Sequence, residues 1–486
     1  MKRCVAWSVL VGCVTLAPVV QGQPRRPRDG GPDVESNGRM PTLAFRTEVP
    51  AHPYDLLLAR PTANSVTLSL LAYQRFRAAV FCGETHGELK AALPVREFKE
   101  GQPAVLLLNN LKPNTRYAYE LRPAPTEAAA VPGTGGTFFT ARAPGATFTF
   151  CVQADSHLDF GTDTEVYQKS LANAQATESD FQIDLGDTFM TDKRNNYRDA
   201  LPQYLAQRYY FGTQSRAVPL LLVLGNHDGE SPSKGAGEAM AVWANGMRKE
   251  YFPNPEPDGF YSGNSTPHPR AGPLEDFYAF EWGDALFVAL DPYWFSNERD
   301  RDNWGRSLGR TQYDWLARTL ATSHARFTFV FVHNLVGGET REGRGGAEAS
   351  QFFEWGGRDL DGRDTFAQHR PGWPSPIHEL LARRGGVVVF HGHDHFYARQ
   401  ERDGVIYQLV PQPGHQRADN QPGTEDYGYK SGVIQGASGI LRVTVARDRA
   451  LVEYVRSYPA AAENGRRKTG AVTHSYSVSP QADAAR

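Results

Sequence analysis

Residues 387–397 read Val-Val-Val-Phe-His-Gly-His-Asp-His-Phe-Tyr, and this stretch decides how the chain is organised. Four consecutive apolar residues, 387–390, are typical of a strand that is buried on both faces. If the backbone stays extended beyond them, His393 and His395 project to the same side, because side chains alternate along a strand. Imidazole is the commonest metal ligand among side chains, so the stretch indicates a metal pair at a strand end. Taken alone, a histidine-rich surface loop fits equally well, and other segments must decide.

Length and composition restrict the class of protein. The chain has 486 residues, more than one hydrophobic core usually holds, so we expect two domains. Its net charge of −2 does not suggest a nucleic-acid-binding or anionic-membrane-binding surface. The cysteines outside the N-terminal apolar run, Cys82 and Cys151, both lie in strand-like segments. The sequence therefore leaves a disulfide and two free thiols equally open, and it indicates no oligomeric state.

The N-terminus has the pattern of a signal peptide. Two basic residues precede an apolar run, 4–20, and small or modest residues lie before a cleavage point near Gly22. The run is short for a membrane span and has no later companion, so we expect no transmembrane segment. A signal peptide over 1–22 predicts a secreted or periplasmic protein. The residues up to Cys13 also resemble a bacterial lipoprotein box, but the apolar run continues beyond it, which favours soluble export.

Residues 43–142 predict an all-β sandwich. Short strand-like runs follow one another with turns between them, and no helical period appears. Residues 111–119, Leu-Lys-Pro-Asn-Thr-Arg-Tyr-Ala-Tyr, resemble a stretch of fibronectin type III domains. That resemblance implies that the Tyr117 side chain makes a hydrogen bond back to the chain at a corner. A polar linker rich in proline and glycine, 23–42, precedes the sandwich.

Residues 145–458 predict a second domain of the α/β class, because strand-like runs alternate with helical ones. The strand-like runs are 148–154, 181–185, 218–224, 327–332 and 387–390. Two irregular insertions, 229–276 and 335–374, interrupt the alternation, and loops of such length usually carry function. Thr311 and Asp314 predict a capping-box start for one helix. Beyond the second domain we expect a frayed tail over 459–486.

Each strand-like run of the second domain ends in side chains that bind metals. In chain order these are Asp155 and His157, then Asp187, then Asn226 with His227, then His333, and finally His393 and His395. Ligands in α/β sheets bind at the carboxyl ends of the strands, so the five groups should converge in space. Carboxylate, amide and imidazole donors together suit a pair of cations that binds a phosphoryl group.

This order of motifs resembles the calcineurin-like metallophosphoesterases, and the preceding sandwich makes the chain similar to purple acid phosphatases. The resemblance implies an N-terminal β-sandwich followed by a four-layer α/β/β/α domain. It also implies two cations with Asp187 shared between them. One would take Asp155, His157, Asp187 and His395, and the other Asp187, Asn226, His333 and His393. His227 would face the substrate, as a phosphate contact or as the proton donor to the leaving group.

The implied reaction is attack of a metal-bound hydroxide on the phosphorus of a phosphate ester. A small-molecule phosphomonoester is the first expectation, on the model of an acid phosphatase. A phosphodiesterase or a nucleotide-hydrolysing enzyme is the alternative. A catalytically inactive binding protein is the third possibility, and the complete set of ligand residues speaks against it.

One position departs from the purple acid phosphatases. Their tyrosine three residues after the bridging aspartate is Met190 here, and His157 replaces a glycine. We therefore expect no purple tyrosinate–iron colour. The two cations could be Fe, Zn, Mn or a mixture that contains Ca, since all accept nitrogen and oxygen ligands.

The insertion 335–374 follows His333 directly and carries several arginines. Arg341 and Arg344 are candidates for contacts to phosphate, because guanidinium groups bind it with two parallel hydrogen bonds. Asn226 and His227 are further candidates for substrate contacts. A solvated loop of glycine and arginine is the alternative for this insertion.

Overall fold

The computed structural model describes residues 45–125, 131–300, 302–340, 342–421 and 423–481, which belong to one compact unit. The predicted signal peptide, the linker, Cys13 and Arg341 lie outside the described residues, so what was expected of them stays a prediction. Within the described ranges, none of the helices combines the length and the apolar character that a membrane crossing needs.

The first part of the described chain is all β. Its strands are β1 (Tyr54–Ala59), β2 (Val66–Ala72), β3 (Phe76–Glu84), β4 (Lys90–Phe98), β5 (Pro103–Leu108), β6 (Arg116–Pro123) and β7 (Thr134–Phe139). One sheet has the order β4-β3-β6-β7, while β1, β2 and β5 belong to a larger sheet. Alternating apolar residues of both sheets, such as Leu68 and Leu121, face one another in a shared core.

The corner predicted from residues 111–119 is present. The Tyr117 hydroxyl accepts a hydrogen bond from the Lys112 backbone N–H at 2.9 Å. The membership of this region in the fibronectin type III class stays a prediction. Cys82 on β3 and Cys151 on β8 (Phe148–Gln153) are both free thiols, which resolves the alternative that the sequence left open.

The larger sheet has nine strands in the order β21-β20-β19-β8-β9-β10-β1-β2-β5. Its further strands are β9 (Phe181–Asp184), β10 (Leu220–Leu222), β19 (Gly439–Val445), β20 (Ala450–Arg456) and β21 (Val472–Val478). Strands β8, β9 and β10 are parallel, so their carboxyl ends lie at one edge. The parallel pairing of β1 with β10, at Ala59 and Leu220, makes the sheet continuous with the N-terminal region.

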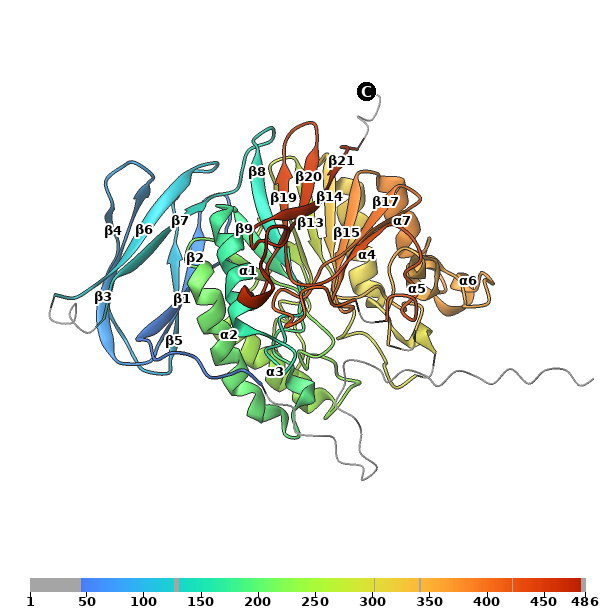
Figure 1. Ribbon diagram of the computed structural model, residues 1–486, viewed down its shortest axis with the longest axis horizontal. Helices are drawn as coiled ribbons and strands as arrows, with labels where there is room; N and C mark the ends of the chain where they lie inside the picture. Colours follow the sequence, from blue (N-terminus) through green and yellow to red (C-terminus); the bar gives the residue numbers. More distant parts are fainter. Residues whose placement is uncertain (1–44, 126–130, 301, 341, 422, 482–486) are drawn as a thin grey trace, which may run out of the picture. The chain divides into compact units, whose positions relative to one another are not determined.

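A second sheet has the order β11-β12-β13-β14-β15-β17-β16-β18. These strands are β11 (Ser262–Gly263), β12 (Tyr278–Trp282), β13 (Ala285–Ala289), β14 (Phe327–Phe331), β15 (Val387–His391), β16 (Tyr397–Arg402), β17 (Val405–Leu409) and β18 (Val433–Gln435). Strands β13, β14, β15 and β17 are parallel, and all residues of β15 are buried, as the apolar run predicts. Figure 1 shows this sheet behind the C-terminal strands of the chain.

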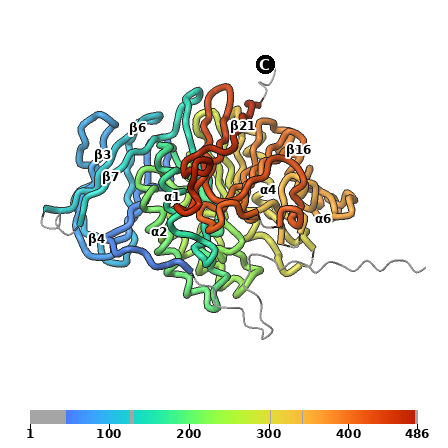
Figure 2. Tube along the Cα trace, in the orientation of Figure 1, coloured from blue at the N-terminus to red at the C-terminus, as the bar shows by residue number. Residues whose placement is uncertain are grey.

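The two sheets pack face to face through phenylalanine rings. The Phe150 ring lies 5.0 Å from Phe287 and 5.2 Å from Phe329, measured between centroids. Helices cover both outer faces, which completes the α/β/β/α layers that the resemblance implied. The helices are α1 (Thr164–Ala176), α2 (Leu201–Gln214), α3 (Glu238–Tyr251), α4 (Gly309–Thr322), α5 (Phe353–Gly356), α6 (Phe366–His369) and α7 (Ile377–Arg384). Figure 2 shows α1 and α2 beside the nine-stranded sheet and α4 in the half formed by the second sheet.

Three local predictions were wrong. The first insertion, 229–276, is not irregular throughout, because α3 buries Met240, Ala241 and Ala244. Helix α4 begins two residues before Thr311, and no side chain caps its first turn. The tail is not frayed throughout, since β21 pairs antiparallel with β20.

Candidate metal centre

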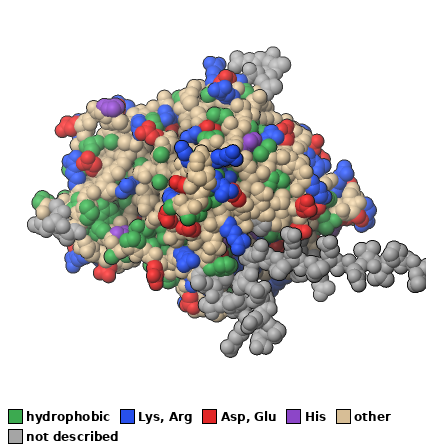
Figure 3. Space-filling model, in the orientation of Figure 1, with side chains coloured by type: hydrophobic (Ala, Val, Ile, Leu, Met, Phe, Trp, Pro, Cys, Tyr) green, Lys and Arg blue, Asp and Glu red, His purple; other side chains and the backbone are tan. Residues whose placement is uncertain are grey.

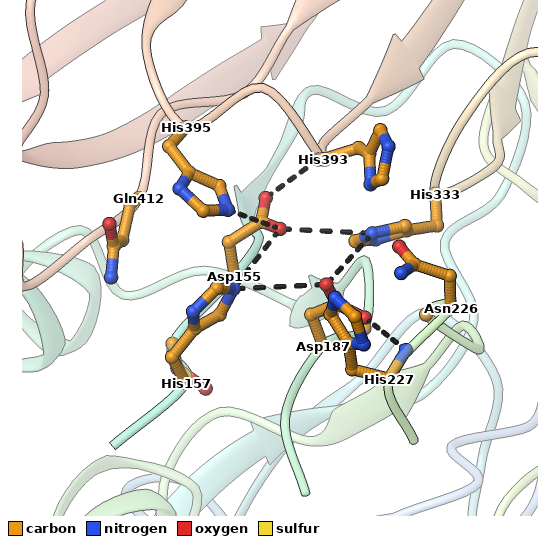
Figure 4. A network of polar contacts seen from close by, with 12 residues as sticks. Asp155, His157, Asp187, Asn226, His227, His333, His393, His395 and Gln412 are labelled. Carbon is orange, nitrogen blue, oxygen red and sulfur yellow. Dashed lines mark hydrogen bonds and ion pairs between the residues drawn. The ribbon is translucent and has the colours of Figure 1, made fainter. Parts of the chain in front are cut away.

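The carboxyl ends of five strands bring the predicted ligand residues together. Loops after β8, β9 and β10 supply Asp155, His157, Asp187 and Asn226, while the ends of β14 and β15 supply His333, His393 and His395. Figure 4 shows their polar atoms around one space, with the two carboxylates between the histidines. The convergence expected from strand order is therefore found.

The donor atoms fall into two groups of three. Asp155, His157 and His395 form one, which we call the His157 group, and Asp187, His333 and His393 form the other, which we call the His393 group. Within each group the ligand atoms lie within 4.8 Å of one another. Figure 4 places His157 and His395 on one side of the two carboxylates and His333 and His393 on the other, with Asn226 on the side of His333.

The distances between these atoms leave room for cations. Asp155 Oδ1 lies 3.5 Å from His395 Nε2 and 3.6 Å from His157 Nε2, while Asp187 Oδ2 lies 3.3 Å from His333 Nε2. Two ligands about 2.1 Å from the same cation are roughly 3–3.5 Å apart, so the spacing suits a shared ion. Asp187 Oδ2 also lies 3.7 Å from His157 Nε2, which places this carboxylate between the groups.

Several of these atoms are buried without a hydrogen-bond partner. They are Asp155 Oδ1, His157 Nε2, Asn226 Oδ1 and His333 Nε2. Leaving a buried polar atom unpaired costs about 1–3 kcal/mol, and four in one place need a common explanation. A pair of cations would satisfy all four, so the residues present fit the dinuclear centre.

Hydrogen bonds to carbonyl oxygens fix the histidine tautomers. His333 Nδ1 lies 2.8 Å from the Leu185 carbonyl, and His393 Nε2 lies 3.1 Å from the Glu342 carbonyl. A carbonyl only accepts, so these nitrogens must carry the protons. His333 therefore presents Nε2 to the site and His393 presents Nδ1, and each ring is held by a second partner as metal-binding histidines usually are.

The backbone at the ligands is left-handed instead of extended. The φ angles are +60° at Asp155, +53° at His157, +55° at Asp187, +76° at His393 and +67° at His395. Non-glycine residues rarely adopt this conformation, and its clustering is typical of functional sites. The condition of an extended backbone is therefore not met, because β15 ends at His391. The two rings enter different groups, as the resemblance implied.

Gly392 allows the loop after β15 to approach Asp155. A Cβ atom at position 392 would lie 2.6 Å from Asp155 Oδ2 and 2.8 Å from Ala154 Cβ. With glycine there, the His393 backbone N–H donates to Asp155 Oδ2 at 2.9 Å. The close approach at Gly392 is thus part of what joins the two sheets at the site.

The carboxylates give the site a negative potential. Burial opposes a charge on His157, but Asp155, Asp159 and Asp187 outweigh it and raise the pKa of His157 to about 10. In the same way Asp187 and Asp155 raise the pKa of His333 to about 9 against the effect of burial. A cation at these imidazoles would satisfy the same potential and leave the rings neutral, as metal binding requires.

Asp228 anchors the loops that carry Asp187 and Asn226. Its carboxylate accepts hydrogen bonds from the backbone N–H groups of Asp187, Thr188, Phe189 and Gly225, at 2.7–3.1 Å. Asp228 therefore orients the backbone on both sides of the ligand residues and does not belong to either donor group.

His227 is oriented by two residues that the sequence did not indicate. Its Nδ1 lies 3.0 Å from Asp192, and Lys234 Nζ lies 2.9 Å from the same carboxylate. Lys234 Nζ also donates to the Asn226 carbonyl at 2.6 Å. Since Nδ1 is engaged by Asp192, Nε2 is the ring nitrogen left for a substrate. Asp192 lies only five residues after Asp187, and this spacing within one loop was the available signal.

Asp159 was also missed. Its Oδ2 lies 3.3 Å from His157 Nδ1, and its Oδ1 accepts from the Gly161 backbone N–H at 2.9 Å. Burial alone would raise the pKa of Asp159, but His157 lowers it to about 2. An acidic residue two positions after a ligand histidine could have indicated this pairing.

Asp394, between the ligand residues His393 and His395, faces the protein interior. It is 2% exposed and accepts hydrogen bonds from Arg344, Tyr429 and the Gly345 backbone N–H. Arg344 Nη1 donates to Asp394 and to the His393 carbonyl, so part of its guanidinium is used within the protein. A contact of Arg344 with phosphate stays a prediction.

Comparison with protein families gives one match. The family model of the calcineurin-like phosphoesterases matches residues 148–397, just over half of the chain. The chain belongs to this family. It is therefore a hydrolase of phosphoric esters. The family uses a dinuclear metal centre, and the two donor groups of this chain are candidates for it. No curated protein matches the sequence.

Two solved structures share the fold of this chain. PhoD has 15% identity and a TM-score of 0.61, with 89% of this chain and 92% of PhoD covered. The purple acid phosphatase PPD1 from yellow lupin (Lupinus luteus) seeds also has 15% identity, with a TM-score of 0.57. That alignment covers 87% of this chain and 74% of the lupin protein. At such identity the likeness concerns the fold.

Proposed function

We propose that the chain is a dinuclear-metal phosphomonoesterase that acts on small-molecule phosphate esters. The observation that carries the proposal is the set of buried, unpaired donor atoms that converge at the ends of five strands. Asp155, His157 and His395 would hold one cation, and Asn226, His333 and His393 the other. Asp187, whose carboxylate lies between the groups, would be shared.

The cations, when bound, supply Lewis-acid polarisation of the phosphoryl oxygens and a water of lowered pKa. The protein's own residues then set the orientation. Asp228 fixes the backbone at Asp187 through three consecutive N–H groups, and Gly392 admits the His393 loop to Asp155. Because these supports are in place before substrate binds, little reorganisation is left for the reaction itself.

His227 would serve the leaving group. Asp192 holds Nδ1 of its ring, which directs Nε2 toward the substrate side. A protonated Nε2 can donate to the ester oxygen as the bond to phosphorus breaks, and general acids of this kind contribute about 10²–10⁴-fold. The partly buried Lys234 offsets the charge of Asp192, so the carboxylate can orient the ring while leaving little net negative charge beside a phosphate.

A phosphomonoester is the proposed substrate class. The proposal rests on the resemblance of the sequence to purple acid phosphatases and on the lupin phosphatase that shares the fold. The face drawn in Figure 3 carries basic and acidic side chains interspersed with one another, which suits a small ligand better than an extended polyanion. Because Met190 takes the place of the tyrosine, no purple tyrosinate–iron colour is expected.

Hydrolysis of p-nitrophenyl phosphate and of bis(p-nitrophenyl) phosphate tests the proposal. Elemental analysis of the purified protein should give two metal ions per chain, and the monoester should have the larger kcat/KM. A larger kcat/KM for the bis-ester would make the protein a phosphodiesterase. A protein that holds two metals but hydrolyses neither ester would contradict both substrate assignments.

A further inference from the structure

We propose that Arg344, Asp394 and Tyr429 form a clamp through which the insertion 335–374 sets the affinity of one of the two cation positions, the one in the His393 group. The inference rests on the proposed dinuclear centre, and it concerns residues that position a ligand histidine through its backbone and its neighbour. We call the three residues the Arg344 clamp.

The clamp encloses the peptide between the two ligand histidines of the last motif. Arg344 Nη1 donates to the His393 carbonyl at 3.0 Å and to Asp394 Oδ1 at 2.7 Å. The Tyr429 hydroxyl donates to Asp394 Oδ2 at 2.8 Å, and the Gly345 backbone N–H donates to the same oxygen at 3.1 Å. Asp394 is thus tied to two segments, the insertion and the loop that contains Tyr429.

The clamp holds a segment whose backbone conformation is energetically unfavourable. His393 and His395, on either side of Asp394, both have left-handed φ angles, which costs of order 1–3 kcal/mol for each such residue. Surroundings must hold a backbone in this conformation, and the ion pair between the partly exposed Arg344 and the buried Asp394 provides that support. Arg344 is itself held in place, because its guanidinium lies 4.4 Å from the centre of the Tyr427 ring.

The same insertion also holds the His393 ring. The Glu342 carbonyl, two residues before Arg344, lies 3.1 Å from His393 Nε2. The insertion therefore contacts the His393 carbonyl, the His393 ring and the adjacent carboxylate. The rings of the His157 group have their contacts outside this insertion: His157 pairs with Asp155, Asp159 and Asp187, and His395 contacts Asp155 and the His157 ring. The clamp supports the backbone of both His393 and His395, but the insertion contacts the ring of His393. Loss of the clamp should therefore weaken one cation position much more than the other.

Metal titration of Arg344→Met tests the inference. Orienting partners of metal ligands typically contribute about 10–100-fold in metal affinity. At a free metal concentration where the natural protein holds two ions, Arg344→Met should hold one, and the second should return at 10- to 100-fold higher metal. Arg344→Lys should restore part of the affinity, because one ammonium group replaces only part of the planar fork.

Arg363→Met is the matched control. Arg363 belongs to the same insertion but is exposed and pairs with Asp361 and Asp359 at the surface. This variant should hold two ions like the natural protein. If Arg344→Met fails to fold, Tyr429→Phe takes its place, since it removes one hydroxyl donor and should shift the same ion in the same direction by less.

Other outcomes would overturn the inference. If Arg344→Met holds two ions with unchanged affinity and a raised KM, Arg344 contacts the substrate instead. Unchanged ion binding with a lower melting temperature alone would reduce the clamp to a structural contact. If the natural protein holds no metal and releases no phosphate, the proposed function itself is contradicted. If only the variant behaves unexpectedly, by retaining two ions, the clamp inference alone is contradicted.

Discussion

The His157 group and the His393 group offer similar donor atoms but are supported by different parts of the chain. His157 is held by Asp159, two residues away in the same loop, at 3.3 Å. His393 is held by Glu342 and Arg344, about fifty residues earlier, in an insertion that interrupts the α/β alternation. The His157 group is therefore supported by residues close to it in the sequence, and the His393 group by a distant insertion. Substitutions in the two supporting segments should weaken the two cation positions separately.

Replacement of Asp187 should have the largest effect, because this carboxylate lies between the groups. Asp187→Asn keeps the shape but removes the charge that both cation positions would share. Polarisation of phosphate by a metal contributes several kcal/mol, so we expect kcat/KM to fall about 1000-fold or more. Both metal ions should also be lost on dialysis. Retention of two ions in Asp187→Asn would show that the groups do not share this residue.

His227→Gln should have the next largest effect, and its size should depend on the leaving group. A general acid contributes about 10²–10⁴-fold, and most for esters whose leaving oxygen is strongly basic. We expect a large loss of kcat/KM for an alkyl phosphate and a smaller one for p-nitrophenyl phosphate. Equal losses on both esters, with metal content unchanged, would assign His227 to phosphate binding instead of proton transfer.

Asp159→Asn is the counterpart of the Arg344 clamp on the other side of the site. Loss of its charge should weaken the cation in the His157 group by about 10–100-fold and leave the other in place. The double variant Asp159→Asn/Arg344→Met should lose both ions. Glu165→Gln, on the exposed face of α1, is the control and should bind metal normally. If Asp159→Asn and Arg344→Met release the same ion, the proposed division of support is wrong.

Tyr119→Phe should have the smallest effect, because it lies away from both groups. The Tyr119 hydroxyl, on β6 of the N-terminal region, donates to the Arg216 carbonyl just before β10 at 2.7 Å. Its loss should lower the free energy of unfolding by about 1 kcal/mol, as for a typical hydrogen bond. Urea unfolding measures the change, and kcat/KM should stay the same. A marked loss of activity would show that the N-terminal region supports the site directly.

Much of the site was predictable because the candidate ligand residues directly follow strand-like runs in the sequence. Buried apolar runs followed by Asp155, Asp187, His333 and the residues after Gly392 predicted convergence, and convergence is found. The residues that orient the ligands were harder to predict from the sequence. Asp192 and Lys234 meet at His227 from different segments, and Asp394 has its partners about 35 and 50 residues away. Pattern and spacing along the chain do not encode contacts of this kind.

The continuity of the nine-stranded sheet was likewise absent from the sequence prediction. Two domains were expected with a boundary near residue 145, yet β1 pairs with β10 across that boundary. Strand-like runs reveal which segments form strands, whereas partner choice at a sheet edge depends on which other edge lies beside it in the fold. The predicted domain limits therefore describe composition, and the sheet itself crosses them.

The sequence alone indicated an all-β region before an α/β region and candidate metal ligands after the strand-like runs, because hydrophobic period and residue type are local properties of the chain. The four-layer architecture and the family followed from the resemblance of these motifs to the calcineurin-like metallophosphoesterases. The resemblance already implied which histidine belongs to which group, and only the tertiary structure showed the backbone conformation that this assignment requires. That assignment depends on left-handed backbone at Asp155, His157, Asp187, His393 and His395, and such a conformation persists only where distant partners hold it in place.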